Sequence, residues 1–427
     1  MISDTESRFP KRYKMMIWAL LAIFLCYVDR VLISLAAIEM QPEFGWSDSK
    51  KGFVLSSFFV GYLIMQLLGG LLANKFGGRN VFLVAVLVWS LFTALTPPAS
   101  YISFEALILA RFMVGFGEGA AFPSVYSLIN GWMKKDEVSR SIGYMTASTS
   151  AGTIFAFLVA GKMMAVYGWP SAFYIFGLLG LVWAIFWFVL IPAKTPKATR
   201  EAEIGGRSTK LPTPWKILAT HPAALSLYLI AMSGAMISLT LVTWMPSYFA
   251  DTFGMSMEDA GAYSLLPFIA ITFTTVAAGI VGDRLIKAGV PSIRVRKWIT
   301  YAGFLVSAAA LSMITLVNDQ LLALACMTAS FAALGVAVPG YSVMPAELLP
   351  QHGEILYGFM SASATLASTV IIALTGIILD TTNSYDAMFL IMIFGSLSGL
   401  LVFAIFGRND PIYGADEVAP NSATAVV

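Results

Sequence analysis

The stretch MMIWALLAIFLCYVDRVLISLAAI, residues 15–38, contains only two charged residues, Asp29 and Arg30. A helix of about 20 apolar residues spans the roughly 30 Å hydrocarbon core of a bilayer. Similar runs recur along the chain, without the period-two alternation of barrel strands. The sequence therefore predicts an all-α integral membrane protein with twelve transmembrane helices. We expect these spans near residues 15–38, 52–74, 80–98, 104–129, 140–166, 172–191, 223–249, 260–282, 297–317, 320–345, 354–379 and 386–407.

The composition also excludes several protein classes. Of the 427 residues, 12% are charged and 58% are apolar, whereas an average soluble domain has about 25% and 45–50%. This excludes a typical cytosolic enzyme, a nucleic-acid-binding protein and a disordered chain. The first apolar run lacks a small-residue cleavage site, so we interpret it as a membrane helix and not a signal peptide. Cys26 and Cys326 lie in apolar runs, which favours packing roles over a disulfide, and we expect no metal and no cofactor.

The positive charges predict an orientation in the membrane. Twenty-one of the 26 Lys and Arg residues lie before span 1 or after an even-numbered span. Only Lys50, Lys51 and Lys162 lie on the other side. Because cytoplasmic loops carry the excess of Lys and Arg, both termini are predicted to be cytoplasmic. The two remaining basic residues, Arg30 and Arg111, lie inside predicted spans.

The chain divides into two halves that resemble each other. The polar segment 192–222 predicts a cytoplasmic linker between an N-terminal six-helix bundle, residues 1–191, and a C-terminal bundle with a cytoplasmic tail, residues 223–427. Residues of spans 5 and 6 match residues of spans 11 and 12 at a fixed offset. Chance matches are common among apolar helices, but these matches occur at corresponding places in the two halves, which favours duplication. Duplicated halves are typical of alternating-access transporters. At an offset of 215, Gly143, Met145, Ala147, Ser148, Gly161, Ala172, Gly180 and Phe188 match Gly358, Met360, Ala362, Ser363, Gly376, Ala387, Gly395 and Phe403.

Several motifs resemble one family of transporters. With six plus six spans and a basic central loop, the chain looks like the major facilitator superfamily. It is similar to the anion:cation symporters, whose bacterial members take up hexonates such as galactonate, aldarates and aromatic acids, and whose animal relatives include sialin and the vesicular glutamate transporters. The segment GYSVMPAELLP departs from many relatives in carrying Glu347. The resemblance rests on YVDR (27–30), GYLIMQLLGGLLANKFGGR (61–79), RFMVGFGEGAAFPSVYSLINGW (111–132), SRSIGY (139–144), GWPSAFYIFG (168–177) and TWMPSYF (243–249).

Four charged residues lie inside the predicted spans of the first half: Asp29, Arg30, Arg111 and Glu118. A charge at the centre of a span costs about 2.5–3.5 kcal/mol, so such residues usually face a cavity. The seven-residue spacing of Arg111 and Glu118 places both on one helix face, about 10 Å apart along the axis. The alternative is a set of buried ion pairs that hold helices together, or, for Arg111, a side chain that snorkels to the outer end of its helix.

The resemblance implies a proton-coupled transporter of a small organic anion. An arginine stays charged and matches a carboxylate, and a buried carboxyl that gains and loses a proton would compete with the substrate for that charge. The implied proton carriers are Asp29 and Glu118, with Arg30 as the carboxylate anchor and Arg111 as the partner of Glu118. Further substrate-lining residues are expected to be Tyr27, Tyr62, Thr149, Ser361 and Ser363, although helix-packing serines are as common.

Loops and aromatic residues predict the gates. The loops between spans 2 and 3 and between spans 8 and 9 indicate cytoplasmic latches. A group of aromatic residues in span 7 fits either an extracellular gate or ordinary interfacial residues. Gly115, Gly117 and Gly119 are interpreted as helix contacts rather than a nucleotide loop. The predicted latch residues are Asn74, Lys75, Arg79, Asp283 and Arg284, and the aromatic group includes Trp244 and Tyr248 with Pro246.

The leading interpretation is a monomeric, proton-driven importer of a sugar acid or another carboxylate. An exporter of drugs or metabolites is the alternative within the same class, and a lipid-handling protein or non-transporting receptor is the alternative outside it. The expected partners are the anion, protons and the lipid bilayer, with no nucleic acid, and the chain is not expected to be an enzyme. The short loop between spans 1 and 2 and the lack of an Asn-x-Ser/Thr sequon favour a bacterial inner membrane.

Overall fold

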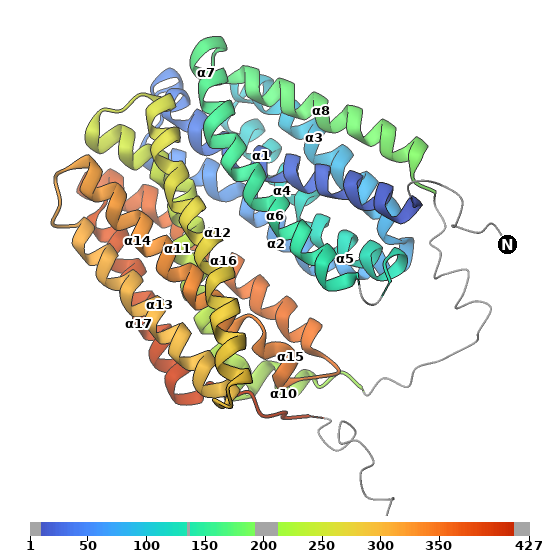
Figure 1. Cartoon of the computed structure of the whole chain (residues 1–427). Helices are drawn as coiled ribbons and strands as arrows, with labels where there is room; N and C mark the ends of the chain where they lie inside the picture. Colours follow the sequence, from blue (N-terminus) through green and yellow to red (C-terminus); the bar gives the residue numbers. More distant parts are fainter. Residues whose placement is uncertain (1–9, 135–136, 193–211, 414–427) are drawn as a thin grey trace, which may run out of the picture. The chain divides into compact units, whose positions relative to one another are not determined.

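A computed structural model describes residues 10–134, 137–192 and 212–413. Twelve helical segments in these residues are long and apolar enough to cross a membrane, which confirms the predicted fold class. Most of the predicted linker and the end of the predicted tail lie outside the described residues. The elements are α1 (Lys11–Phe44), α2 (Asp48–Phe76), α3 (Gly78–Ile102), α4 (Phe104–Gly119), α5 (Ala121–Trp132), α6 (Val138–Phe155), the π-helical turn η1 (Ala156–Ala160), α7 (Gly161–Tyr167), α8 (Pro170–Leu190), α10 (Trp215–Thr220), α11 (Pro222–Phe253), α12 (Met257–Lys287), α13 (Ser292–Ile314), α14 (Gln320–Tyr341), α15 (Met344–Leu348), α16 (Gly353–Thr382) and α17 (Asp386–Phe406) (Figure 1).

Three of the predicted spans are not continuous α-helices. The fourth consists of α4 and α5, separated at Ala120. Pro123 has no N–H to donate to the carbonyl of Gly119, so the regular hydrogen-bond ladder cannot run through this point. The fifth span contains η1 between α6 and α7, and the tenth ends in the short helix α15.

By its internal contacts the chain forms two compact units. Unit 1 comprises residues 1–206, 240–269 and 369–385, and unit 2 comprises residues 207–239, 270–368 and 386–427. The helices α11, α12 and α16 are therefore each shared between the units. The predicted division into bundles at 192–222 remains a prediction.

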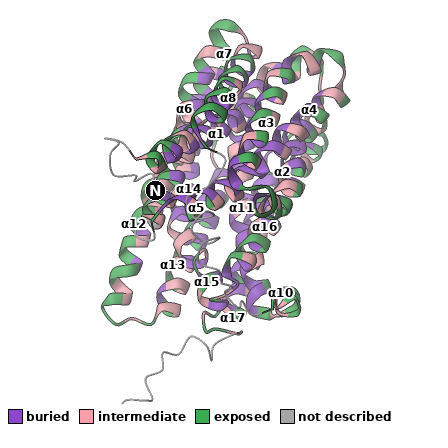
Figure 2. Cartoon of the chain, turned by 90° about the vertical axis from the view of Figure 1, so that its right-hand side faces the viewer, coloured by how far each residue is buried: buried purple, intermediate pink, exposed green. Residues whose placement is uncertain are grey.

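The helix surfaces are suited to lipid. Buried residues follow the sides of the helices that face neighbours, while exposed residues cover the other sides (Figure 2). The exposed residues include large apolar side chains such as Leu71, Val189 and Phe273, which are 68%, 72% and 71% exposed. In water such a surface would promote association, whereas in a membrane it contacts lipid. The span formed by α12 is the least buried of the twelve, because only 17% of the residues in its most apolar stretch are buried.

A sharp turn joins α1 to α2. Gly45 ends α1 in the left-handed conformation at φ 61°, which a glycine adopts without steric cost. Two residues later the Ser47 side chain accepts a hydrogen bond from the Lys50 N–H and caps α2. The two helices therefore leave the turn as antiparallel neighbours, with polar side chains of both at the same end.

Glycines bring α4 close to α2 and α3. A Cβ atom at Gly115 would overlap the Phe58 carbonyl of α2, and one at Gly117 would lie 2.7 Å from the backbone nitrogen of Trp89 in α3. This confirms that these glycines are helix contacts. The close packing places Glu118, between Gly117 and Gly119, in the interior of unit 1.

Candidate functional site

Four charged side chains from α1 and α4 lie inside unit 1. Asp29 and Arg30 are adjacent on α1, and Arg111 and Glu118 are two turns apart on α4. Asp29 is 1% exposed, Arg111 and Glu118 are not exposed, and the Arg30 side chain is 11% exposed. Arg111 therefore does not snorkel. Because burial of a charge is costly, the partners of these four groups determine what the site can do.

Arg30 and Glu118 form an ion pair between α1 and α4. The Arg30 Nε and Nη2 atoms both donate to Glu118 Oε2, at 3.3 and 3.0 Å. The sequence predicts Arg111 as the partner of Glu118, whereas the hydrogen-bonded partner is Arg30. Two helical turns separate Arg111 from Glu118 along α4, which is too far for a direct bond between them. The pair therefore connects one residue from each of the two charged helices.

Aromatic rings surround the Arg30 guanidinium. Its carbon lies 4.5 Å from the ring centroid of Tyr27, 4.8 Å from that of Tyr62 and 5.2 Å from that of Phe58. The faces of aromatic rings attract a cation and hold a planar guanidinium in one orientation. The structure thus brings the predicted residues Tyr27 and Tyr62 to Arg30, and it adds Phe58, which the sequence analysis did not select.

The other charged atoms have no hydrogen-bond partner within the described part of the chain. These are both carboxylate oxygens of Asp29, all three guanidinium nitrogens of Arg111, and Oε1 of Glu118. The guanidinium carbon of Arg111 lies 5.6 Å from the ring centroid of Phe58. An unsatisfied buried polar group typically costs about 1–3 kcal/mol, and more when it is charged. The site therefore keeps hydrogen-bonding capacity that its own side chains do not use.

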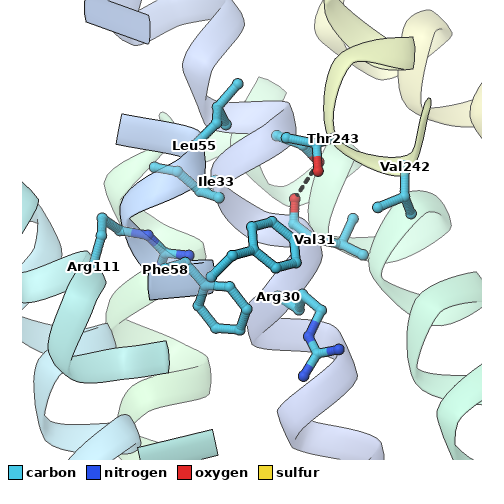
Figure 3. Close-up of a pocket in the computed structure, with 10 residues that line it drawn as sticks. Arg30, Val31, Ile33, Leu55, Phe58, Arg111, Val242 and Thr243 are labelled. Atoms are coloured by element: carbon cyan, nitrogen blue, oxygen red, sulfur yellow. Dashed lines mark hydrogen bonds between the residues drawn. The ribbon is translucent and has the colours of Figure 1, made fainter. Parts of the chain in front are cut away.

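A small cavity lies between the two arginines. It is lined by residues of α1, α2, α4 and α11, and Arg30 and Arg111 approach Phe58 from different sides of it (Figure 3). Its volume is about 10 Å³, which is enough for about one water molecule. A substrate therefore requires the surrounding helices to separate.

Unit 2 contains a larger pocket with a different lining. Its volume is about 180 Å³, and none of its lining residues is charged. Most of the hydroxyl groups come from α11, α14 and α16, among them those of Tyr341 and Tyr357, and Ser342 directly follows α14. A pocket of this kind can accept and donate hydrogen bonds without balancing a charge. The hydroxyl-bearing lining residues are Ser238, Tyr341, Ser342, Tyr357 and Ser361.

The structure separates the three hydroxyl residues predicted to bind substrate. Ser361 lines the pocket of unit 2. Ser363, on the same helix, donates to the Met360 carbonyl and is not among the lining residues. Thr149 lies on α6 in unit 1 and donates to the Thr146 carbonyl. The bonds of Ser363 and Thr149 are local bonds within a helix, and substrate contact by these residues remains a prediction.

The predicted latch residues are divided between the units. Asn74 and Lys75 are exposed at the end of α2 in unit 1, and Asp283 and Arg284 are exposed near the end of α12 in unit 2. Arg79 is buried, and it donates at 2.8 Å to two carbonyls at the end of α8. Arg79 therefore ties α3 to α8, and the cytoplasmic latch remains a prediction.

A second polar network, which the sequence analysis missed, lies near the α1–α2 turn. It contains the buried Lys51, which the analysis treated as a loop charge, together with Gln41, Asp251 and Asp380. One signal was available in the sequence. Lys51 precedes Leu55 by four residues and Phe58 by seven, which places it on the same buried face of α2.

Comparison with known proteins identifies the family. The model of the Major Facilitator Superfamily matches residues 19–354. The chain belongs to the Major Facilitator Superfamily. It is thus a multi-pass membrane transporter and not a member of an enzyme family.

The relatives of this superfamily member include several plant proteins. "Probable anion transporter 4, chloroplastic" from Oryza sativa subsp. japonica is 31% identical over 420 residues, which cover 96% of this chain and 71% of the relative. "Ascorbate transporter, chloroplastic" from Arabidopsis thaliana is 30% identical, with coverage of 95% and 76%. "Sodium-dependent phosphate transport protein 1, chloroplastic" from Arabidopsis thaliana is 29% identical, with coverage of 95% and 80%.

Solved structures of the superfamily share the fold. A bacterial homologue of the human lysosomal transporter Spinster, in an inward-facing and occupied conformation, has a TM-score of 0.77 at 15% identity, covering 94% of this chain and 98% of that one. A D-xylose-proton symporter has a TM-score of 0.75 at 16% identity, covering 93% and 98%. At these identities the likeness supports the fold alone.

Proposed function

We propose that this protein imports a small organic anion, such as a sugar acid, together with protons by alternating access. The observation that carries the proposal is the buried pair of Arg30 and Glu118, in which Arg30 uses two donors on one carboxylate oxygen. A guanidinium can also place two such donors on the two oxygens of a substrate carboxylate. Glu118 thus occupies the position on Arg30 that the substrate would take.

Competition for Arg30 provides the coupling. When Glu118 binds a proton, it loses its charge and its hold on Arg30, and the guanidinium becomes available to the substrate anion. When the proton leaves, the carboxylate displaces the anion. Proton and substrate then favour each other's binding through a shared free energy. Asp29 and Arg111, buried and without hydrogen-bond partners among the described residues, are proposed as the second proton carrier and a second cation for the anion.

The relatives support an anionic substrate. Their names specify anions in general, ascorbate and phosphate. Ascorbate combines an acidic group with hydroxyls. The two arginines that line the small cavity of unit 1 suit the acidic group of such a molecule. A hydroxylated organic acid, such as a sugar acid, is therefore proposed over inorganic phosphate, and the chain is proposed to function like the anion:cation symporters.

Uptake into proteoliposomes tests this function. Purified protein is reconstituted, and labelled gluconate, ascorbate and phosphate are supplied under a proton gradient, a sodium gradient or no gradient. We expect gluconate, ascorbate or both to accumulate when the lumen is alkaline, and a protonophore should abolish the accumulation. Accumulation driven by the sodium gradient alone would show that sodium, and not the proton, is the coupling ion. No accumulation of any of the three anions would refute symport.

A matched pair of variants tests the site within the same assay. Arg12 and Arg30 both lie on α1, and each forms an ion pair, Arg12 with the peripheral Glu137 and Arg30 with Glu118. Uptake should be lost in Arg30→Ala and retained in Arg12→Ala. Equal uptake by the two variants would remove the anchor role of Arg30.

A further inference from the structure

The polar network near the α1–α2 turn joins distant parts of the sequence within unit 1. It includes Gln41 of α1, Asp48 and Lys51 of α2, Asp251 of α11 and Asp380 of α16. Asp48 and Asp380 are 332 residues apart in the chain. The network therefore fastens the ends of α11 and α16 to the first two helices.

Lys51 forms the buried part of this network. Its side chain is not exposed, and Nζ donates to Gln41 Oε1 at 2.8 Å. The same nitrogen lies 3.6 Å from Asp251 Oδ2 and 5.4 Å from the ring centroid of Trp244. A carboxylate and a ring face from α11 thus stabilise a cation that α2 buries. Trp244 itself donates to the Ile372 carbonyl of α16 at 3.1 Å.

Asp380 caps a helix of the other half of the chain. Its two carboxylate oxygens accept the N–H groups of Asp48 at 2.7 Å and of Ser49 at 2.9 Å. These are among the first N–H groups of α2, which have no partner inside the helix and carry its positive end. Ser47 already caps the Lys50 N–H. The α2 N-terminus is therefore completed by a side chain from α16.

Two glycines allow the backbones to meet at this point. A Cβ atom at Gly376 of α16 would overlap the Asp48 carbonyl. One at Gly52 of α2 would lie 3.1 Å from the Ala373 carbonyl and 3.2 Å from the Gly376 Cα. Any side chain at Gly376 would force α16 away from α2, and Asp380, one helical turn further, would lose its reach to the α2 amides.

We propose that Gln41, Asp48, Lys51, Asp251, Gly376 and Asp380 form a conformational latch, the α2 latch, that closes the protein at the α1–α2 turn and opens during each transport cycle. The contacts suit reversible closure. The bonds to Asp380 are solvent-exposed and Asp251 is 43% exposed, so water replaces the lost partners when the latch opens. One helical turn after Lys51 on α2, Leu55 borders the small cavity together with Val242 and Thr243 of α11.

Thiol labelling tests the latch without any substrate, so its result is separate from that of the uptake assay. A single cysteine is placed at Leu55, which is 1% exposed, in a Cys26→Ala, Cys326→Ala background. A membrane-impermeant maleimide is added from the side of the α1–α2 turn. The test variants are Gly376→Ala and Asp380→Asn. The control is Gly358→Ala on the same helix, where a Cβ meets nothing within 4 Å.

The latch predicts faster labelling in both test variants. Loss of a helix cap corresponds to a shift of roughly twofold to thirtyfold in an equilibrium. Asp380→Asn keeps one of the two acceptor oxygens and loses the other, so we expect it to accelerate labelling toward the lower end of this range. Gly376→Ala should accelerate it at least as much, and Gly358→Ala should not change it. Hydrogen exchange at Asp48 and Ser49 should also quicken in Asp380→Asn. Unchanged labelling in both test variants, or equal acceleration in the Gly358→Ala control, would overturn the proposal.

Discussion

Unit 1 contains two charged clusters that differ in how their hydrogen bonds are satisfied. In the α2 latch, Lys51 donates to Gln41, Asp380 accepts two backbone N–H groups and Asp251 accepts the Tyr385 hydroxyl. In the central cluster, by contrast, Asp29 and Arg111 have no hydrogen-bond partner within the described residues, and one oxygen of Glu118 has none.

This difference in hydrogen bonding distinguishes a structural role from a ligand-binding role. A satisfied network contributes to stability when it is intact, and it gives little to a ligand because its donors and acceptors are in use. An unsatisfied buried charge lowers stability, but its unused hydrogen-bonding capacity remains available to a proton or an anion. The latch is therefore expected to govern conformation, and the central cluster is expected to govern substrate and protons.

Removal of the Glu118 carboxylate should destabilise the protein most. In Glu118→Leu, Arg30 and Arg111 both remain charged because arginine does not lose its proton in proteins. Breaking a buried ion pair in this way costs about 3–5 kcal/mol. Denaturant unfolding in detergent measures the loss. The more peripheral pair of Arg12 and Glu137, whose side chains are 20% and 13% exposed, offers a control. Glu137→Leu should cost less than Glu118→Leu because water can reach the unpaired Arg12. Equal losses of unfolding free energy in the two variants would show that burial does not make the Arg30–Glu118 pair more important for stability than the peripheral pair.

A conservative change at Arg30 should weaken substrate binding without removing charge. Lysine cannot present two parallel donors, and it does not stack on the rings of Tyr27 and Tyr62 as a guanidinium does. We expect Arg30→Lys to lose about 2–3 kcal/mol of binding free energy, roughly a 30- to 150-fold drop in affinity. Calorimetry with a transported carboxylate measures it, with Arg12→Lys as the control. Affinity within a few-fold of wild type would mean that charge alone suffices.

Neutralisation of Glu118 should uncouple transport from protons. A pH gradient of one unit supplies about 1.4 kcal/mol per proton, or about tenfold accumulation. Wild-type uptake should rise as the outside becomes more acidic than the lumen. In Glu118→Gln the side chain cannot change its charge, so accumulation should fall to the level without a gradient while exchange of labelled for unlabelled substrate continues at any pH. Loss of exchange as well would indicate a structural role for Glu118.

The sequence predicts the membrane spans and the central charges for simple physical reasons. Long apolar runs are visible one residue at a time, and a charge inside such a run, such as Asp29 or Glu118, stands out because lipid excludes it. Helical geometry also predicts that Arg111 and Glu118 share a face. The pairing of Glu118 with Arg30 could not be predicted, since it depends on how α1 packs against α4.

The α2 latch was hidden from the sequence for a different reason. Lys51, Asp251 and Asp380 lie at the ends of apolar runs, where a charge is expected in the aqueous loops and attracts no notice. Lys51 and Asp251 are 200 residues apart in the chain, and Asp48 and Asp380 are 332 apart. No local sequence pattern indicates such contacts. The aromatic residues of span 7 gave a partial signal, because the predicted gate residue Trp244 does lie against Lys51.

The smallest effect is expected at the edge of the latch. The Tyr385 hydroxyl, in the turn between α16 and α17, donates to Asp251 at 2.6 Å. Tyr385→Phe removes this bond, and we expect the latch to weaken by about 1 kcal/mol, roughly a fivefold shift toward the open form, because Asp251 can turn to water. Leu55→Cys labelling measures the shift.

The pH dependence of this contribution follows from the state of the phenol. Burial, and then the charge of Asp251, raise the pKa of Tyr385 well above its usual value. A raised pKa means that the contribution is fully present below the ordinary tyrosine value and is lost only as the pH rises beyond it. The difference between wild type and Tyr385→Phe should therefore stay constant from about pH 5 to about pH 9. A difference that vanishes within this range would assign the gating to another titrating group and make the latch, like the central cluster, a proton-sensitive site.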